Sequence, residues 1–177
     1  MSRQFWQELL AWATADGTPV ANTIAETIIF PDVTIPANYM SGERTLRLRA
    51  FGKLSTTLTP TMTFALRWGG VAGVLLATTE PLTMGSTVTN ANWDLEALIQ
   101  ARASGSSGSL LVMGVCRVHT AAGTVLVNVF GSAGFAAPAP VMVDLTIDTA
   151  LSLTADWSAA SASNTLTGLL YHLETLN

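Results

Sequence analysis

This 177-residue sequence is poor in charge, cysteine and histidine. Charged residues make up 11% of the chain, against about 25% in an average soluble domain. The one cysteine, Cys116, excludes a disulfide within the chain. The two histidines, His119 and His172, are too few for the ligand clusters that hold zinc. Cys116 and His119 would point to opposite faces of a strand and could not chelate together. We therefore expect neither a metal ion nor any other cofactor.

Sequence motifs for catalysis are also missing. The chain contains no Gly-x-Ser-x-Gly elbow, no Gly-x-Gly-x-x-Gly and no P-loop, so serine hydrolase chemistry and nucleotide binding have no support. Asp94 and Glu96 would share one face of an extended segment, as a glycosidase carboxylate pair could. Such pairs on a polar strand face are far more often solvated surface. We expect the protein not to be an enzyme.

Long apolar runs and a basic stripe are absent too. The longest uncharged window, Val118 to Val143, is interrupted by Pro138 and Pro140, and a membrane helix needs about 20 mainly apolar residues without such breakers. The first residues lack the order of a signal peptide. The net charge is −4 and the pI about 4.9, unlike a nucleic-acid binder. We expect no membrane span, no nucleic-acid partner and synthesis in a reducing cytoplasm.

What the chain has in abundance is apolar surface. Hydrophobic residues make up 49% of it, and its mean hydropathy is +0.42. One domain of this size can bury a sizeable core, yet so little charge leaves apolar area to be covered by something else. Burial between subunits is the explanation that we favour, which predicts a homo-oligomer.

The clearest pattern lies between Arg44 and Ser55. Apolar residues alternate with polar and charged ones here, which is typical of a strand with one face on a core. The segment holds half of the basic residues of the chain, and three roles are open for them: a solvated strand face paired with acids, a contact to an acidic protein surface such as a capsid, or a phosphate or nucleic-acid site. These residues are Arg44, Arg47, Arg49 and Lys53.

In the segment from Asn92 to Ala103, helix propensity and the alternation of apolar and polar residues favour different structures. Its residues are good helix formers, but Trp93, Leu95 and the following odd-numbered positions are apolar while their neighbours are mostly polar. Only Leu98 breaks the alternation. The segment is flanked by strand-like sequence on both sides, so we predict a strand.

Leu110 to His119 is apolar on both faces. Such a strand needs a second covering layer in an antiparallel sheet, which a partner subunit or the N-terminal arm could supply. Leu111, Met113 and Val115 lie on the face opposite to Leu110 and are our candidate subunit interface.

The remaining pattern is that of a single all-β domain. It contains about eight to ten short strands separated by turns rich in Gly, Ser and Pro. This favours an antiparallel β-sandwich of jelly-roll type over residues 23–177. Residues 1–22 are predicted to form an arm, a short helix or an edge strand. Gly168 is expected to supply a β-bulge in the last strand.

Five tryptophans offer a different kind of site. Trp68, Trp93 and Trp157 lie on apolar faces and are expected in the core. Trp6 and Trp12 are the two tryptophans outside this set. An exposed tryptophan would favour a carbohydrate-binding module.

Three segments together resemble structural proteins of tailed bacteriophages: Thr14 to Val20, Leu66 to Gly73, and Trp93 to Arg102 with the Gly-Ser turn after it. The resemblance implies a jelly-roll module of the virion, and within that group it favours a head decoration (cement) protein. Such proteins are trimers on the capsid exterior that brace the major capsid protein. A tail, neck or fibre component is the alternative. The resemblance transfers no site residue.

Overall fold

The computed structural model describes residues 7–41, 44–121 and 123–176, and these contain strands but no helix. Consequently none of the described segments is a helix that could cross a membrane. The strands are β1 (Gln7–Trp12), β2 (Val20–Ala21), β3 (Thr27–Ile28), β4 (Val33–Ile35), β5 (Thr45–Thr56), β6 (Thr61–Trp68), β7 (Val74–Thr78), β8 (Leu82–Thr83), β9 (Val88–Ala103), β10 (Gly108–Ala121), β11 (Thr124–Phe130), β12 (Val141–Val143), β13 (Thr149–Trp157) and β14 (Thr165–Leu176).

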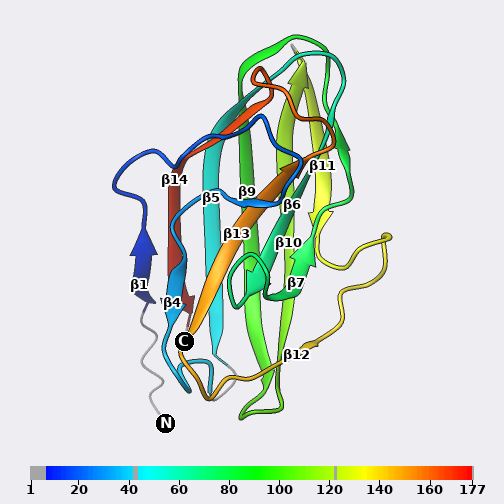
Figure 1. Ribbon diagram of the computed structural model, residues 1–177. Coiled ribbons are helices and arrows are strands. Elements are labelled where there is room, and N and C mark those ends of the chain that lie inside the picture. The colour runs from blue at the N-terminus through cyan, green and yellow to red at the C-terminus, as the bar shows by residue number, and fades with distance from the viewer. Residues whose placement is uncertain (1–6, 42–43, 122, 177) are drawn as a thin grey trace.

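The strands form two antiparallel sheets packed face to face (Figure 1). The larger sheet has the order β1-β14-β5-β9-β10-β11, with β12 added to β10 and β2 to β14. The smaller sheet has the order β3-β13-β6-β7, with β4 added to β13 and β8 to β6. The predicted single β-sandwich is therefore confirmed.

The pairing is nested along the sequence. β5 pairs with β14, β6 pairs with β13, and inside these two pairs β9 pairs with β10. A long antiparallel ribbon that folds over on itself produces this order, and it makes the sandwich jelly-roll-like.

Alternation predicted the long strands correctly. In β5 the residues Leu46, Leu48, Ala50 and Leu54 are buried. In β9 the segment that propensity would make a helix is a strand, and its odd-numbered apolar residues from Trp93 onward face the core. Pairing with β5 on one side and β10 on the other outweighs helix propensity, because a central strand fills its hydrogen bonds along both edges.

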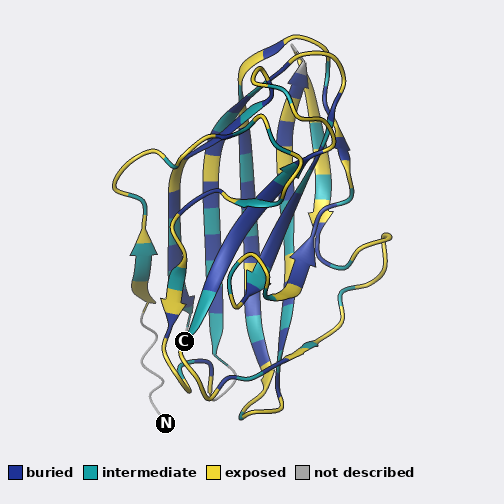
Figure 2. Cartoon of the chain, in the orientation of Figure 1, coloured by how far each residue is buried: buried dark blue, intermediate teal, exposed yellow. Residues whose placement is uncertain are grey.

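Buried residues gather on the strands where the two sheets face each other (Figure 2), and aromatic side chains anchor the core between the sheets. Trp93 of the larger sheet packs on Phe64 of the smaller sheet with ring centroids 5.0 Å apart. Trp68 and Trp157 are also buried, as predicted. Trp157 Nε1 donates to the carbonyl of Val20 at 3.1 Å, which ties the short β2 to the core.

The N-terminal segment corrects one expectation. Residues 7–12 form β1, an edge strand that pairs with β14, so the helix alternative is wrong for them. The helical spacing of Leu9 and Trp12 does not mark a buried face, since both side chains are exposed. Open backbone groups along β14 instead recruit the segment as a strand. Trp6 and the rest of residues 1–6 lie outside the described residues.

Candidate functional site

The outer face of the larger sheet carries an apolar surface where β9, β10 and β11 lie side by side. Cross-strand register sets Met113 opposite Leu98 and Val115 opposite Val129, with Val127 in the next row. Met113 is 57% exposed, Val127 65% and Val129 60%. We call Leu98, Leu111, Met113, Val115, Val127 and Val129 the apolar face.

The structure places the three predicted interface residues, Leu111, Met113 and Val115, on this outward side. Leu110 and Val112 of the same strand are buried, so the two-sided apolar character of β10 is confirmed. What covers the outward side stays a prediction. The sequence argument missed Val127 and Val129, because only the register of β11 against β10 brings them beside Val115.

A ladder of ion pairs crosses the outer face beside the apolar face. Arg47 pairs with Glu174 at 2.6 Å, Arg49 with Glu96 at 3.2 Å and Arg117 with Asp94 at 2.5 Å. The hydrogen bond from Arg47 holds the pKa of the Glu174 carboxyl below its usual value. Each pair joins residues on adjacent strands, so the ladder reinforces the strand register.

Two of the four basic residues between Arg44 and Lys53 take the first of the three expected roles, that of a strand face paired with acids. Arg47 and Arg49 are paired with acids across the sheet. The guanidinium of Arg44 lies over the ring of Tyr39, 4.1 Å from its centroid. Lys53 has no ion-pair partner among the described residues. A contact of these side chains with a capsid surface stays a prediction.

The described residues bring together no recognisable catalytic or metal-binding group. Asp94 and Glu96 are each held by an arginine on the exposed sheet face, which is not the arrangement of a buried acid next to a nucleophile. Cys116 is buried, which raises the pKa of its thiol, while His119 faces outward. Nowhere in residues 7–41, 44–121 and 123–176 do three His, Cys, Asp or Glu side chains gather as metal ligands would.

The loop after β11 presents an aromatic side chain to solvent. Phe135 is 85% exposed and adopts a φ of 56°, an unusual conformation for a bulky residue. The Glu80 carboxylate accepts hydrogen bonds from the backbone N–H groups of Gly134 and Phe135, and its own backbone N–H donates to Asn128. The loop therefore holds Phe135 outward by specific contacts.

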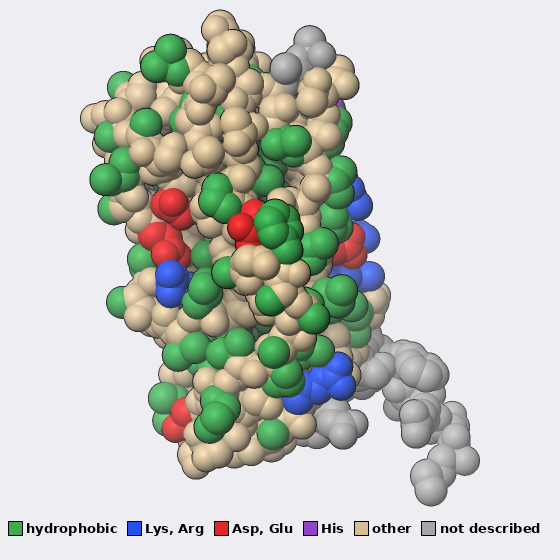
Figure 3. Space-filling model, turned by 90° about the vertical axis from the view of Figure 1, so that its right-hand side faces the viewer, with side chains coloured by type: hydrophobic (Ala, Val, Ile, Leu, Met, Phe, Trp, Pro, Cys, Tyr) green, Lys and Arg blue, Asp and Glu red, His purple; other side chains and the backbone are tan. Residues whose placement is uncertain are grey.

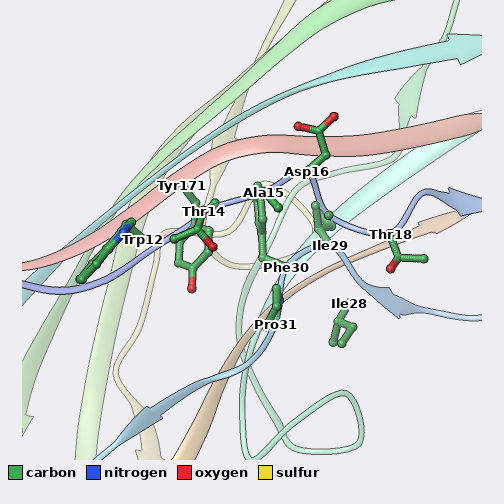
Figure 4. Close-up of a pocket in the computed structure, with 12 residues that line it drawn as sticks. Trp12, Thr14, Ala15, Asp16, Thr18, Ile28, Ile29, Phe30, Pro31 and Tyr171 are labelled. Atoms are coloured by element: carbon green, nitrogen blue, oxygen red, sulfur yellow. The ribbon is translucent and has the colours of Figure 1, made fainter.

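A groove of about 400 Å³ opens at the β1 edge of the sandwich (Figure 4). One wall is the segment from Trp12 to Thr18, and the other is the segment from Ile28 to Pro31, with Tyr171 between them. Such a volume lies within the range of about 300–1,000 Å³ found for small-molecule sites.

Two glycines allow the walls to approach so closely. A Cβ on Gly17 would lie 2.2 Å from the carbonyl oxygen of Ile29, and one on Gly168 would lie 2.2 Å from the ring of Phe30. Gly168 also sits at the register shift in β14, so the predicted β-bulge is confirmed. Phe30 then packs on Tyr171 with ring centroids 4.6 Å apart.

Charge is sparse among the residues that line the groove. Figure 3 looks onto the right-hand side of Figure 1, away from the groove, and there charged side chains form a few small groups separated by hydrophobic and uncharged surface. None of the residues that line the groove is Lys, Arg or His, and the one acidic side chain among them is Asp16. The groove would therefore suit an uncharged ligand, whereas the apolar face is bordered by the ion-pair ladder.

Comparisons with known proteins add little. The sequence matches no family model and no curated protein. One similar solved structure is described as the CBM2 module of Lactobacillus casei BL23 phage J-1 evolved Dit. It aligns with a TM-score of 0.39 and 10% identity, over 99% of this chain and 98% of that chain. A likeness at this level carries no argument about function.

Proposed function

We propose that this protein is a non-enzymatic structural subunit of a tailed-bacteriophage particle and that it self-associates through the apolar face. The observation that carries the proposal is the exposure of Met113, Val127 and Val129 on one contiguous sheet surface. Monomeric proteins rarely expose large contiguous apolar patches, and larger ones mark interaction sites. The phage assignment is supported by the sequence resemblance described above.

The assembly that we propose is a trimer. A ring with threefold symmetry uses heterologous contacts, in which two different patches of the same chain meet. The apolar face and the loop that presents Phe135 are two such patches, and the loop begins where β11 ends. A trimer in which they meet would bury Phe135 together with Met113, Val127 and Val129, which are all largely exposed in the single chain.

The self-association is tested by charge insertion. Met113→Asp and Val129→Asp should each shift the protein from trimer to monomer in analytical ultracentrifugation, because a carboxylate would be buried without a partner. Ile24→Asp is the matched control, since Ile24 is 65% exposed on the connection between β2 and β3. Dissociation by the control alone, or by none of the three variants, would contradict the proposal.

The position in the particle is a finer part of the proposal. A head decoration protein would bind the exterior of empty heads and the major capsid protein, whereas a tail, neck or fibre component would bind purified tails. Co-sedimentation of the trimer with heads and with tails assembled without it separates the two positions. Binding to neither would overturn the virion assignment and leave the self-association standing.

Carbohydrate binding is a second candidate function, which we propose on the exposure of Trp12. This side chain is 57% exposed at one end of the groove, while Trp68, Trp93 and Trp157 are buried. Exposed aromatic rings offer a face on which the C–H groups of a sugar ring can pack. A host-attachment module would bind glycans on an array, and Trp12→Ala would weaken that binding.

A further inference from the structure

We propose that the outer face of β5 and β14 binds an acidic protein surface of the particle, with Lys53 as the charged contact and Phe51 and Leu170 as the apolar contact. This inference rests on the proposed role as a subunit of a phage particle, and it names the attachment surface and the chemistry of its partner. The surface is separate from the apolar face, which lies toward the β11 margin of the same sheet.

Two apolar side chains and one cation lie together on the outer side of β5 and β14. Register sets Phe51 directly opposite Leu170, and these side chains are 40% and 49% exposed. Lys53 follows Phe51 by two residues and so lies on the same side of β5. Trp12 of β1, which is opposite His172, extends this surface to the margin of the sheet (Figure 1). We call Phe51, Lys53 and Leu170 the attachment patch.

Lys53 is a cation without a counter-ion. Its cross-strand neighbours are Thr167 on β14 and Asn92 on β9, and neither offers a carboxylate. Among the described residues no ion pair includes it. Two arginines of the same strand, in contrast, each have a carboxylate beside them. The positive charge of Lys53 is therefore available to the carboxylate of a partner.

The ion-pair ladder next to the patch also presents its cations to solvent. In all three pairs the arginine side chain is more exposed than the carboxylate that it holds. The exposed fractions are 26% and 13% for Arg47 and Glu174, 39% and 36% for Arg49 and Glu96, and 47% and 29% for Arg117 and Asp94. In a chain with a net charge of −4, this face is therefore a basic surface, and an acidic partner complements it.

The mixture of groups favours a protein surface over a nucleic acid. Asp94 lies opposite Phe51 on the side away from Leu170, and two more carboxylates belong to the ladder. A phosphate backbone would meet these acids and would leave two apolar side chains without a match. A protein surface with carboxylates around an apolar centre complements both the cation and the apolar pair.

Co-sedimentation of the full chain with heads and with tails assembled without it tests the inference. Phe51→Asp should weaken binding about tenfold or more, because it places a carboxylate against the acidic partner and removes the apolar contact. Lys53→Glu should weaken binding about three- to tenfold, and high salt should weaken the binding of the wild type. Lys53→Arg keeps the charge and should bind as the wild type does.

Arg102→Glu is the matched charge reversal, because Arg102 lies ten residues further along β9 than Asn92, the neighbour of Lys53. It should leave binding unchanged, and all of these variants should sediment as the wild type does when no particle is present. A patch variant that dissociates the trimer would place the patch in the subunit interface and overturn its role in attachment.

Wild-type binding that Phe51→Asp and Lys53→Glu leave unchanged would overturn the attachment patch but not the virion assignment. Wild-type binding to neither heads nor tails would overturn both. Tighter binding of Lys53→Glu, or wild-type binding to a DNA duplex that Lys53→Glu abolishes, would overturn the proposed chemistry of the partner.

Discussion

From Leu110 to Val115 the two faces of β10 are both apolar, and they have very different surroundings. Leu110 and Val112 lie in the core and are 0% and 2% exposed. Met113, the next residue along the strand, is 57% exposed on the outer face. On the inward side the smaller sheet supplies the covering layer. On the outward side no residue of the described part of the chain does so. The difference shows that an apolar strand face predicts burial against another layer, and that this layer need not belong to the same chain.

The inward face should be far more sensitive to truncation than the outward one. Leu110→Ala removes a fully buried side chain and leaves a cavity between the sheets, so it should lower the free energy of unfolding by about 2–5 kcal/mol. Urea denaturation at a protein concentration where the chain is monomeric measures it. Met113→Ala, the matched outward variant, should change that free energy by less than about 0.5 kcal/mol. Equal losses from the two variants would contradict the distinction between the faces.

Gly168 tests how closely the groove wall packs on the sheet. Gly168→Ala places a Cβ 2.2 Å from the Phe30 ring, which must move, and such overpacking typically lowers the free energy of unfolding by about 1–3 kcal/mol. Thermal denaturation measures the loss. Gly123→Ala is not a suitable control, because Gly123 has a φ of 79°. Ala15→Gly, in the exposed segment between β1 and β2, serves as the control instead. A Gly168→Ala variant as stable as the wild type would show that Phe30 is not pinned against β14.

The loop that presents Phe135, which we propose meets the apolar face of a neighbouring subunit, should affect assembly rather than folding. Glu80→Gln weakens the acceptor that holds the backbone of Gly134 and Phe135, and Phe135→Ala removes the exposed ring. Each should weaken the trimer by about tenfold or less, that is, by up to about 1.4 kcal/mol. Sedimentation over a range of concentrations measures the shift. Full retention of the trimer in both variants would exclude the loop from the interface.

The ion-pair ladder should give the smallest effect. The pKa of Glu174 is lowered by the hydrogen bond from Arg47, with Arg49 and His172 also facing it. A carboxyl with a lowered folded pKa stabilises the fold above its unfolded pKa, about 4.3 for Glu, and that contribution is lost as the pH falls through the folded pKa. We expect less than about 1 kcal/mol from this partly exposed pair. Urea midpoints at pH 7 and pH 3, compared with those of Glu174→Gln, measure it; an unchanged pH dependence in the variant would contradict the assignment.

The strands and their faces could be predicted from the sequence because alternation is local. β5, β9 and β10 each show it, and even the exception at Leu98 is informative, since that side chain lies on the apolar face. The one feature of the last strand that breaks alternation, the bulge at Gly168, was also predictable from the glycine. The local sequence pattern therefore predicts which segments are strands and which of their side chains face the core.

The groove and the full apolar face could not be predicted, because both depend on register between distant segments. The groove joins the segments from Trp12 to Thr18 and from Ile28 to Pro31 with Tyr171, which lies more than a hundred residues after both of them in the sequence. Sequence alternation gives Val127 and Val129 a common face but does not say which strand they lie beside. The ion-pair partners of Arg47 and Arg49 were unpredictable for the same reason.

The native mass of the protein tests the central claim most directly. Sedimentation equilibrium at micromolar concentration should give about 56 kDa, three times the 18.6 kDa of one chain, and Met113→Asp should reduce it to the mass of one chain while leaving the circular dichroism spectrum unchanged. A wild-type protein that stays a monomer up to high concentration would contradict the claim, because the apolar face would then be stable in water without a second subunit to cover it.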